Sequence, residues 1–503
     1  MELELFNNLA VGFNAALSPE NFMFCFVGAV IGTFIGVLPG LGPTATVAML
    51  LPVTYYLSPT ASLIMLAGIY YGSQYGGSTT AILMNLPGEV SSSVTAIDGY
   101  QMARKGEAGK ALAIAAIGSF LAGTFATFLI AIVALPLASV ALQFGSTQYF
   151  ALILFGLVTS TALAHGSAIK AVAMIVAGML FGMVGTDVDT GAFRFTLGLI
   201  ELSDGLSTVA VALGIFGIVE ILKNLENMPD SAAGTAKITT LMPTRADLRQ
   251  AAGPIARGSV LGSLLGVLPG GGSILSAFSS YTLEKRISKH PERFGKGAIE
   301  GVAGPEAANN AGAQTSFIPL LTLGIPSHPL MALMIGALMI QGITPGPNVV
   351  TEQPQLFWGV IASMWIGNAM LVILNLPLVG LWVSMLKIPY RYLLPAIVAF
   401  STIGVFTVSN SGFDVYVLAF FGVLGYTFHK FGCEPAPFLM GFVLGGLLEE
   451  HLRRAMVFSR GDPTVFLTDP ISGSLLFVAV VVLILITLPA ISRKREEIFV
   501  EED

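Results

Sequence analysis

Two segments of this chain interrupt apolar runs with glycine and proline: PGLGPTAT (39–46) and PGGGSILS (269–276). A helix broken in this way leaves N–H groups and carbonyls outside the helical ladder, and these groups need partners. Free N–H groups at the start of a half-helix suit a carboxylate, whereas freed carbonyls suit Na⁺. We therefore expect a small-anion or cation site here, although close helix packing or a simple kink is the alternative. The candidate binding residues are Pro39, Gly40, Gly42, Thr44, Gly270, Gly271, Gly272 and Ser273, with Na⁺ near Gly40 or Gly270 and no other metal site.

A second pair of segments is rich in amide and hydroxyl side chains: 71–89 (YGSQYGGSTTAILMNLPGE) and 305–328 (PEAANNAGAQTSFIPLLTLGIPSH). Such neutral donors and acceptors are costly in lipid unless they line a cavity or satisfy one another. A site of this kind would bind a polyanion through many dipoles, and hydrogen bonding between helices is an equally weighted alternative. The candidates are Ser78, Thr79, Thr80, Asn85, Asn309, Asn310, Gln314, Thr315 and Ser316.

Few charged side chains lie near these segments. Glu306 precedes the amide run, and we favour a place at the cytoplasmic boundary over a role as cation ligand or proton carrier. His328 follows a proline, and we favour an incidental position over substrate contact. Asp98 is interpreted as part of a solvated loop with Arg104 and Lys105, and Glu220 and Glu449 as topological signals at helix ends.

The composition requires a lipid bilayer around these segments. Hydrophobic residues make up 54% of the 503 residues and charged residues only 11%, against about 25% charged in soluble proteins. The mean hydropathy is +0.80, and 57 glycines and 27 prolines cluster inside the apolar runs. No basic stripe indicates nucleic acid, and two isolated cysteines indicate neither disulfides nor a metal site.

The chain contains an internal duplication. Four matches occur in the same order in both halves: 32–44 with 262–274, 82–88 with 321–327, Tyr149 and Gly182 with Tyr392 and Gly425, and 217–222 with 446–452. We therefore divide the chain into an interfacial N-terminal helix (1–19), transmembrane repeat 1 (20–225), a cytoplasmic linker (226–255), transmembrane repeat 2 (256–455), an extra C-terminal transmembrane helix (472–491) and a charged tail (492–503).

In two pairs of equivalent loops, one loop is basic and its counterpart in the other repeat is not. The loop 281–297 is basic and its counterpart 55–60 is not, whereas 99–110 is basic and its counterpart 327–330 is not. Because basic loops favour the cytoplasm, this pattern predicts inverted topology. The stretches 61–97 and 331–386 exceed one span of about 20 residues. The predicted fold is therefore an all-α polytopic membrane protein with two inverted-topology repeats, discontinuous or re-entrant helices, and one extra C-terminal transmembrane helix.

Motifs of hydrolytic enzymes and nucleotide-binding proteins are missing from the sequence. It has no H-E-x-x-H, no G-x-x-x-x-G-K-[ST], and no G-x-S-x-G in a strand–turn–helix context. We therefore expect no enzyme and no cofactor, and ion-gradient coupling is the remaining energy source for uphill movement.

Several long motifs carry a family resemblance. They are 36–57 (GVLPGLGPTATVAMLLPVTYYL), 71–89, 98–106 (DGYQMARKG), 305–326 and 342–347 (GITPGP). In these motifs, and over nearly its whole length, the chain resembles the large membrane subunit of the tripartite tricarboxylate transporter family. The resemblance implies a permease of the bacterial inner membrane, with a periplasmic solute-binding protein and a small four-helix membrane subunit as partners.

We therefore expect a secondary active transporter that imports tricarboxylates or related carboxylates by Na⁺ or H⁺ symport. The two broken-helix regions would meet near the midplane of the membrane. An anion-conducting channel is the first alternative, and an intramembrane enzyme is the second.

Overall fold

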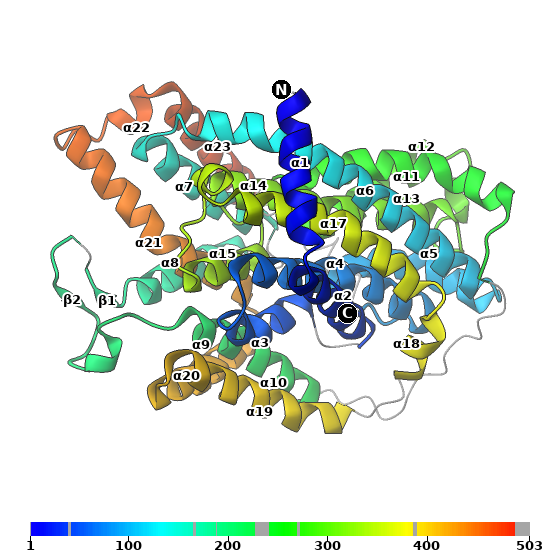
Figure 1. The fold of residues 1–503 in the computed structure, drawn as a ribbon, viewed down its shortest axis with the longest axis horizontal. Helices are drawn as coiled ribbons and strands as arrows, with labels where there is room; N and C mark the ends of the chain where they lie inside the picture. The colour runs from blue at the N-terminus through cyan, green and yellow to red at the C-terminus, as the bar shows by residue number, and fades with distance from the viewer. Residues whose placement is uncertain are drawn as a thin grey trace.

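The computed structural model describes residues 2–38, 42–163, 167–187, 189–226, 241–268, 272–385 and 390–487. Nearly all of this chain is helical (Figure 1), which confirms the predicted all-α membrane fold. Within the described ranges the sheet structure is one short antiparallel pair, β1 (Gly185–Thr186) with β2 (Phe193–Arg194).

Helices of the first half begin at the N-terminus and end before the linker. They are α1 (Glu2–Ala16), α2 (Pro19–Val37), α3 (Pro43–Thr54), α4 (Pro59–Met84), η1 (Val90–Ser92), α5 (Ser93–Arg104), α6 (Ala108–Ala141), α7 (Ser146–Leu163), α8 (Ala168–Gly182), η2 (Ile200–Leu202), α9 (Thr208–Ala212), the π-helical η3 (Leu213–Ile218) and α10 (Val219–Glu226).

Helices of the second half follow a related order. They are α11 (Arg245–Gly266), α12 (Gly272–Ile287), η4 (Pro291–Arg293), α13 (Glu300–Thr315), α14 (Phe317–Leu323), α15 (Pro329–Ile340), α16 (Asn348–Glu352), α17 (Pro354–Asn375), α18 (Val379–Met385), α19 (Tyr390–Ser409), α20 (Gly412–Lys430), α21 (Pro435–Phe458), α22 (Val465–Thr468) and α23 (Pro470–Thr487).

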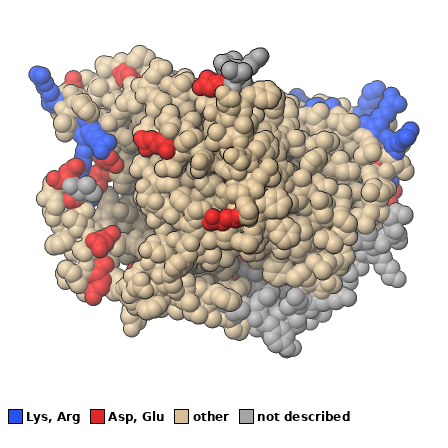
Figure 2. Space-filling model, in the orientation of Figure 1, with Lys and Arg blue, Asp and Glu red and all other residues tan. Residues whose placement is uncertain are grey.

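Five helical segments are long and apolar enough to cross a membrane. They are Pro19–Val37, Ala108–Ala141, Thr208–Glu226, Pro354–Asn375 and Gly412–Lys430. Large apolar side chains such as Phe128, Phe400 and Phe477 are exposed on the outer helices, as expected where lipid is the solvent. On the face drawn in Figure 2, Lys and Arg side chains lie toward the two ends of the long axis, and the broad surface between them is mostly uncharged.

Glycines bring two helix pairs into backbone contact. Along α2, every fourth residue from Gly28 to Gly36 is a glycine, and a Cβ added at any of these would overlap a carbonyl oxygen of α4. Along α11, the same spacing runs from Gly258 to Gly266, and added Cβ atoms would overlap carbonyl oxygens of α13. Small residues at this spacing let membrane helices approach closely. The glycines that match between the two halves of the sequence therefore perform the same packing role.

Helices near the end of each half also pack on helices of the other half. Helix α8 of the first half packs on α21 of the second, where Gly178 and Gly182 lie against the backbone of Phe438 and Phe442. Helix α20 of the second half packs on η3 of the first. The halves are therefore interlocked, whereas their inverted relationship and the domain boundaries remain predictions.

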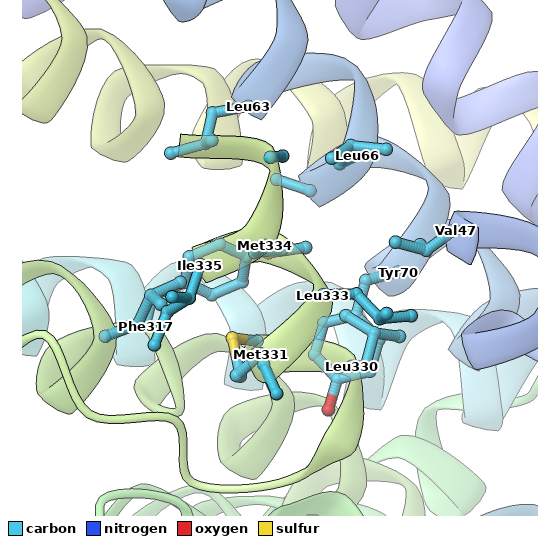
Figure 3. Close-up of a cluster of buried hydrophobic side chains, with 14 of the residues drawn as sticks. Val47, Leu63, Leu66, Tyr70, Phe317, Leu330, Met331, Leu333, Met334 and Ile335 are labelled. Atoms are coloured by element: carbon cyan, nitrogen blue, oxygen red, sulfur yellow. The ribbon is translucent and has the colours of Figure 1, made fainter. Parts of the chain in front are cut away.

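A buried apolar cluster joins α4 to α15 (Figure 3). Leu63, Leu66 and Tyr70 of α4 lie in the same cluster as Leu330 and Met334 of α15. All five side chains are almost fully buried, and van der Waals packing of such side chains holds helices together within a membrane. The cluster fixes α4 relative to the turn that precedes α15.

The terminal helices pack on the body of the protein. In α1, the ring of Phe13 stacks on Trp365 of α17 with ring centroids 5.8 Å apart. At the other end of the chain α23 packs on α7. The interfacial position of α1 remains a prediction, and residues 488–503, which include the end of the expected last helix and the whole tail, lie outside the described residues.

Candidate functional site

The polar side chains of α4 and α13 are buried inside the protein. Those predicted as site residues on these two helices and in Ser316 are 3% exposed or less: Ser78, Thr79, Thr80, Asn309, Asn310, Gln314, Thr315 and Ser316. They therefore face protein, not lipid, as the cost of exposing polar groups to hydrocarbon requires.

Glu306 lies at the centre of the polar contacts made by α13. Its side chain is fully buried and accepts hydrogen bonds from the hydroxyls of Thr95 (2.5 Å) and Ser119 (3.3 Å). The side-chain amide nitrogen of Asn310 donates to the Ser119 hydroxyl (2.7 Å) and to the backbone carbonyl of Glu306 (3.1 Å). The structure thus places Glu306 in the protein interior, and its position at the cytoplasmic boundary of the membrane remains a prediction.

A small cavity adjoins this carboxylate. It is lined by Tyr75, Ser78, Thr79, Leu112, Ala115, Ala116, Ser119, Glu306 and Asn375. About 10 Å³ is open to the centre of a water molecule, which is roughly the space that one water occupies. Among the described residues, the Tyr75 hydroxyl, the Asn375 carbonyl oxygen and the Asn310 carbonyl oxygen have no hydrogen-bond partner.

The turn after α4 carries a second carboxylate, Glu89. It accepts hydrogen bonds from the Gln74 amide (2.9 Å) and the Ser91 hydroxyl (2.5 Å). Asn309 of α13 lies beside it, although both polar atoms of this amide lack a hydrogen bond within the described structure. Helix α13 of the second half therefore lies against the turn that follows α4 in the first half.

The turn after α14 carries His328 in the corresponding place. Its Nε2 lies 3.1 Å from the hydroxyl of Tyr70 on α4, and Ser273 and Ser316 lie beside the same hydroxyl. Gly272, the first residue of α12, has φ +50, and an added Cβ would lie 3.2 Å from the His328 ring. His328 therefore lies among the polar side chains of α4 and α12.

These two turns are matched in the sequence. The spacing that aligns Pro87 with Pro326 also aligns Glu89 with His328, and Tyr70 with Asn309. Each half thus presents one titratable side chain after its proline, and that side chain faces a polar residue on the long helix of the other half.

Some of the remaining predicted residues are described by the structure and some are not. Pro39, Gly40, Gly270 and Gly271 lie outside the described residues. Gly42 precedes α3, where Thr44 is half-buried, and Asn85 is an exposed C-terminal cap with φ 57. The hydroxyls of Thr80, Thr315 and Ser316 donate to carbonyls of their own helices, which indicates a packing role for the first two.

Residues 22–440 match the model of the Tripartite tricarboxylate transporter TctA family. The chain belongs to this family. It is therefore a multi-pass protein of the inner membrane and the large subunit of a tripartite transporter, which implies a binding protein and a small subunit as partners.

Two relatives come from Agrobacterium vitis. The chain is 62% identical over 501 residues, or 100% of both chains, to an uncharacterized 52.8 kDa protein in the TAR-I ttuC' 3' region. It is 67% identical over 242 residues, 48% of this chain and 100% of the relative, to an uncharacterized protein in the TAR-II ttuC' 3' region. No solved structure matches the chain significantly.

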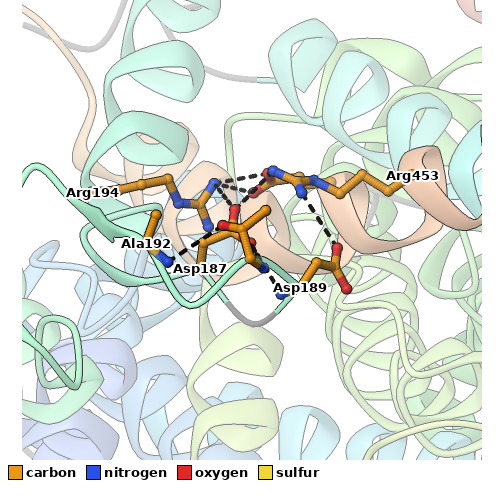
Figure 4. Close-up of polar contacts among 7 residues, drawn as sticks. Asp187, Asp189, Ala192, Arg194 and Arg453 are labelled. Atoms are coloured by element: carbon orange, nitrogen blue, oxygen red, sulfur yellow. Dashed lines mark hydrogen bonds and ion pairs between the residues drawn. The ribbon is translucent and has the colours of Figure 1, made fainter.

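An ion-pair network lies in this TctA-family chain at the β1–β2 hairpin, at one end of the long axis (Figures 1 and 4). A guanidinium nitrogen of Arg194 lies 2.8 Å from a carboxylate oxygen of Glu449. The guanidinium of Arg453 lies 2.8 Å from the carboxylate of Asp187 and 2.6 Å from that of Glu449. Backbone hydrogen bonding from Thr190, helped by Arg453, holds the pKa of Asp187 below its usual range. The network borders a cavity of about 440 Å³, so Glu449 joins the hairpin to α21 in addition to any topological role.

Asp98 lies in the protein interior and not in the solvated loop that was predicted. It is fully buried and accepts hydrogen bonds from the Tyr281 hydroxyl (3.0 Å) and from the backbone N–H groups of Gly297 (2.7 Å) and Ala298 (2.8 Å). The prediction of a solvated loop was wrong because these donors come from the other half of the chain. Asp98 anchors the basic loop after α12 to α5.

Sequence reasoning missed several residues of the site. Thr95 and Ser119 are hydroxyl residues outside the two polar runs, and nothing in their local sequence distinguishes them from the other hydroxyls of their helices. Asn375, by contrast, is an amide near the end of the apolar helix α17, which also carries Asn368, and the cost of an amide in lipid could have indicated it.

Proposed function

We propose that this protein is a secondary active permease that imports tricarboxylates or related carboxylates together with Na⁺ or H⁺. The observation that carries the proposal is the crossed contact of the two halves. Glu89 lies beside Asn309, and His328 contacts Tyr70, so a movement of one half against the other changes both polar sites together.

The turn at His328 is the better site for the carboxylate. Tyr70 and Ser273 supply hydroxyl donors there, and the imidazole of His328 adds a further nitrogen. Gly272 begins a 16-residue helix whose first N–H groups have no partner within the helix. Neutral donors of this kind bind an anion without a fixed positive charge, which favours release after transport.

The side of the protein at the β1–β2 hairpin is the proposed periplasmic side. The basic loop after α12 lies at the opposite end of the long axis (Figure 1), and basic loops favour the cytoplasm. At the hairpin end, by contrast, Arg194 and Arg453 are paired with Asp187 and Glu449. The cavity of about 440 Å³ beside Arg194 and Arg453 then opens toward a solute-binding protein. We propose this cavity as the route by which captured substrate enters.

A channel is the main alternative, and uptake by the assembled system separates the two. The chain, its small subunit and its binding protein are reconstituted in proteoliposomes, and citrate uptake is followed under an imposed Na⁺ or pH gradient. A symporter accumulates citrate above the outside concentration and loses it when an ionophore collapses the gradient. Simple equilibration of citrate would instead support a channel, and a chemically altered product would support an enzyme.

A further inference from the structure

Glu306 is neutralised differently from Glu284 and Asp98, two other buried acids of the protein. Glu284 is 2% exposed and lies 2.6 Å from Arg257, and Asp98 accepts two backbone N–H groups. Glu306 has no ion pair with Lys, Arg or His among the described residues, and its recorded partners are hydroxyls. A buried carboxylate in this position is stable only when it is protonated or holds a cation.

More oxygen atoms surround Glu306 than one proton on its carboxyl group could hydrogen-bond. Thr95, Ser119 and Ser78 place hydroxyls beside the carboxylate. The Tyr75 hydroxyl and the side-chain carbonyl oxygen of Asn375 line the cavity and are buried without a hydrogen-bond partner in the described structure.

A proton on Glu306 would neutralise the carboxylate but would leave the unpartnered oxygens as they are. Each unpartnered buried polar atom of this kind calls for an explanation. A small cation in the cavity would supply a partner for the two that line it, the Tyr75 hydroxyl and the Asn375 side-chain carbonyl oxygen.

The cavity has the size and the chemistry for one such ion. About 10 Å³ is open to the centre of a water molecule, and the lining supplies oxygen ligands, which hard cations prefer. Among the described residues no group of three or more His, Cys, Asp or Glu side chains is placed to hold a metal. A single carboxylate therefore matches a monovalent ion.

We infer that Glu306, with the oxygens of Tyr75, Ser78, Ser119 and Asn375, forms a binding site for one Na⁺ in this cavity. This assignment rests on the proposed symport and names the ion and its position. Tyr75 and Ser119 belong to helices α4 and α6 of the first half, whereas Glu306 and Asn375 belong to α13 and α17 of the second. Bound Na⁺ therefore links the two halves, so its arrival and release bias their relative position.

Equilibrium binding of ²²Na⁺ to the purified full chain, without carboxylate, tests the site. The wild type should bind one Na⁺ saturably, and Glu306→Gln should weaken this binding by roughly tenfold or more. Ser119→Ala should weaken it less, and it serves as the second variant if the first does not fold. Glu352→Gln, an acid-to-amide change at an exposed position, is the matched control and should bind as the wild type does.

Two outcomes overturn the site. Wild-type protein that binds no Na⁺, or a folded Glu306→Gln variant that binds Na⁺ with unchanged affinity, would each remove it. Uptake in proteoliposomes distinguishes this failure from that of the proposed function. Proton-driven uptake without Na⁺ binding would leave the permease and remove the site, whereas Na⁺ binding without any carboxylate uptake would leave the site and remove the permease.

Discussion

Two carboxylate-containing regions of the protein neutralise negative charge in different ways. At the β1–β2 hairpin, Asp187 and Glu449 are held by Arg194 and Arg453 at distances of 2.6–2.8 Å. In the interior, Glu306 has hydroxyl partners and no ion pair among the described residues. A guanidinium is permanently charged and tied to the chain, so the hairpin network is a fixed structural joint. The interior site remains available to a mobile cation.

The comparison also separates stability from transport. Arg453 is 38% exposed along its side chain, and ion pairs at such positions contribute about 1 kcal/mol or less each. The interior groups are fully removed from water, where an unneutralised charge is far more costly. Changes at the hairpin should therefore alter stability modestly, whereas changes around Glu306 should alter ion-coupled transport.

The largest expected effect comes from giving Glu306 a fixed cation. Ser119→Lys places an ammonium beside the carboxylate, as Arg194 is placed beside Glu449. We expect carboxylate uptake in proteoliposomes to be abolished and ²²Na⁺ binding to be lost, because the cation site is already occupied. Ser119→Ala controls for loss of the hydroxyl and should retain part of the uptake. Na⁺-driven uptake by a folded Ser119→Lys protein would contradict the assignment.

Removal of the amide that supports the site should have the next largest effect. Asn310→Ala deletes the donor to Ser119 and the unpartnered carbonyl oxygen, and we expect about tenfold weaker apparent Na⁺ affinity in uptake. Thr80→Ala on α4 is the matched control, because its hydroxyl donates only to the Gly77 carbonyl of its own helix. Equal Na⁺ dependence in the two variants would place Asn310 among the packing residues.

A smaller effect is expected at the hairpin. Arg453→Gln removes the pairs to Asp187 and Glu449, and thermal unfolding in detergent should show a loss of about 1 kcal/mol. The Na⁺ concentration that half-saturates uptake should stay at the wild-type value. A shifted Na⁺ dependence would show that the two regions are coupled and not separate.

The smallest expected effect is on acid stability. Because the folded-state pKa of Asp187 is lowered, its contribution to stability is present above the unfolded pKa of about 3.9 and is lost as pH falls through the folded value. Asp187→Asn should therefore unfold more readily than the wild type at neutral pH, with the difference shrinking below about pH 4. Melting curves between pH 3 and 7 measure this, and a difference that stays constant with pH would exclude the linkage.

Local patterns in the sequence were sufficient for the all-α membrane fold and for the burial of the polar runs. Apolar content, the glycine spacing around Gly32 and Gly262, and the dense hydroxyl and amide runs are all features of short segments. The partners of Glu306 could not be predicted, because Thr95 and Ser119 lie on helices far away in the chain. Asp98 was misjudged for the same reason: its donors follow α12, nearly 200 residues later.

Simultaneous measurement of ²²Na⁺ and radiolabelled citrate fluxes tests the central claim most directly. The assembled transporter is reconstituted with wild-type chain or with Glu306→Gln, and both fluxes are followed in the same proteoliposomes. We predict that Na⁺ enters with citrate in a fixed ratio in the wild type. In Glu306→Gln the Na⁺ flux should be lost, and an imposed citrate gradient should not drive Na⁺ entry. An unchanged ratio of Na⁺ to citrate in the Glu306→Gln protein would contradict the account.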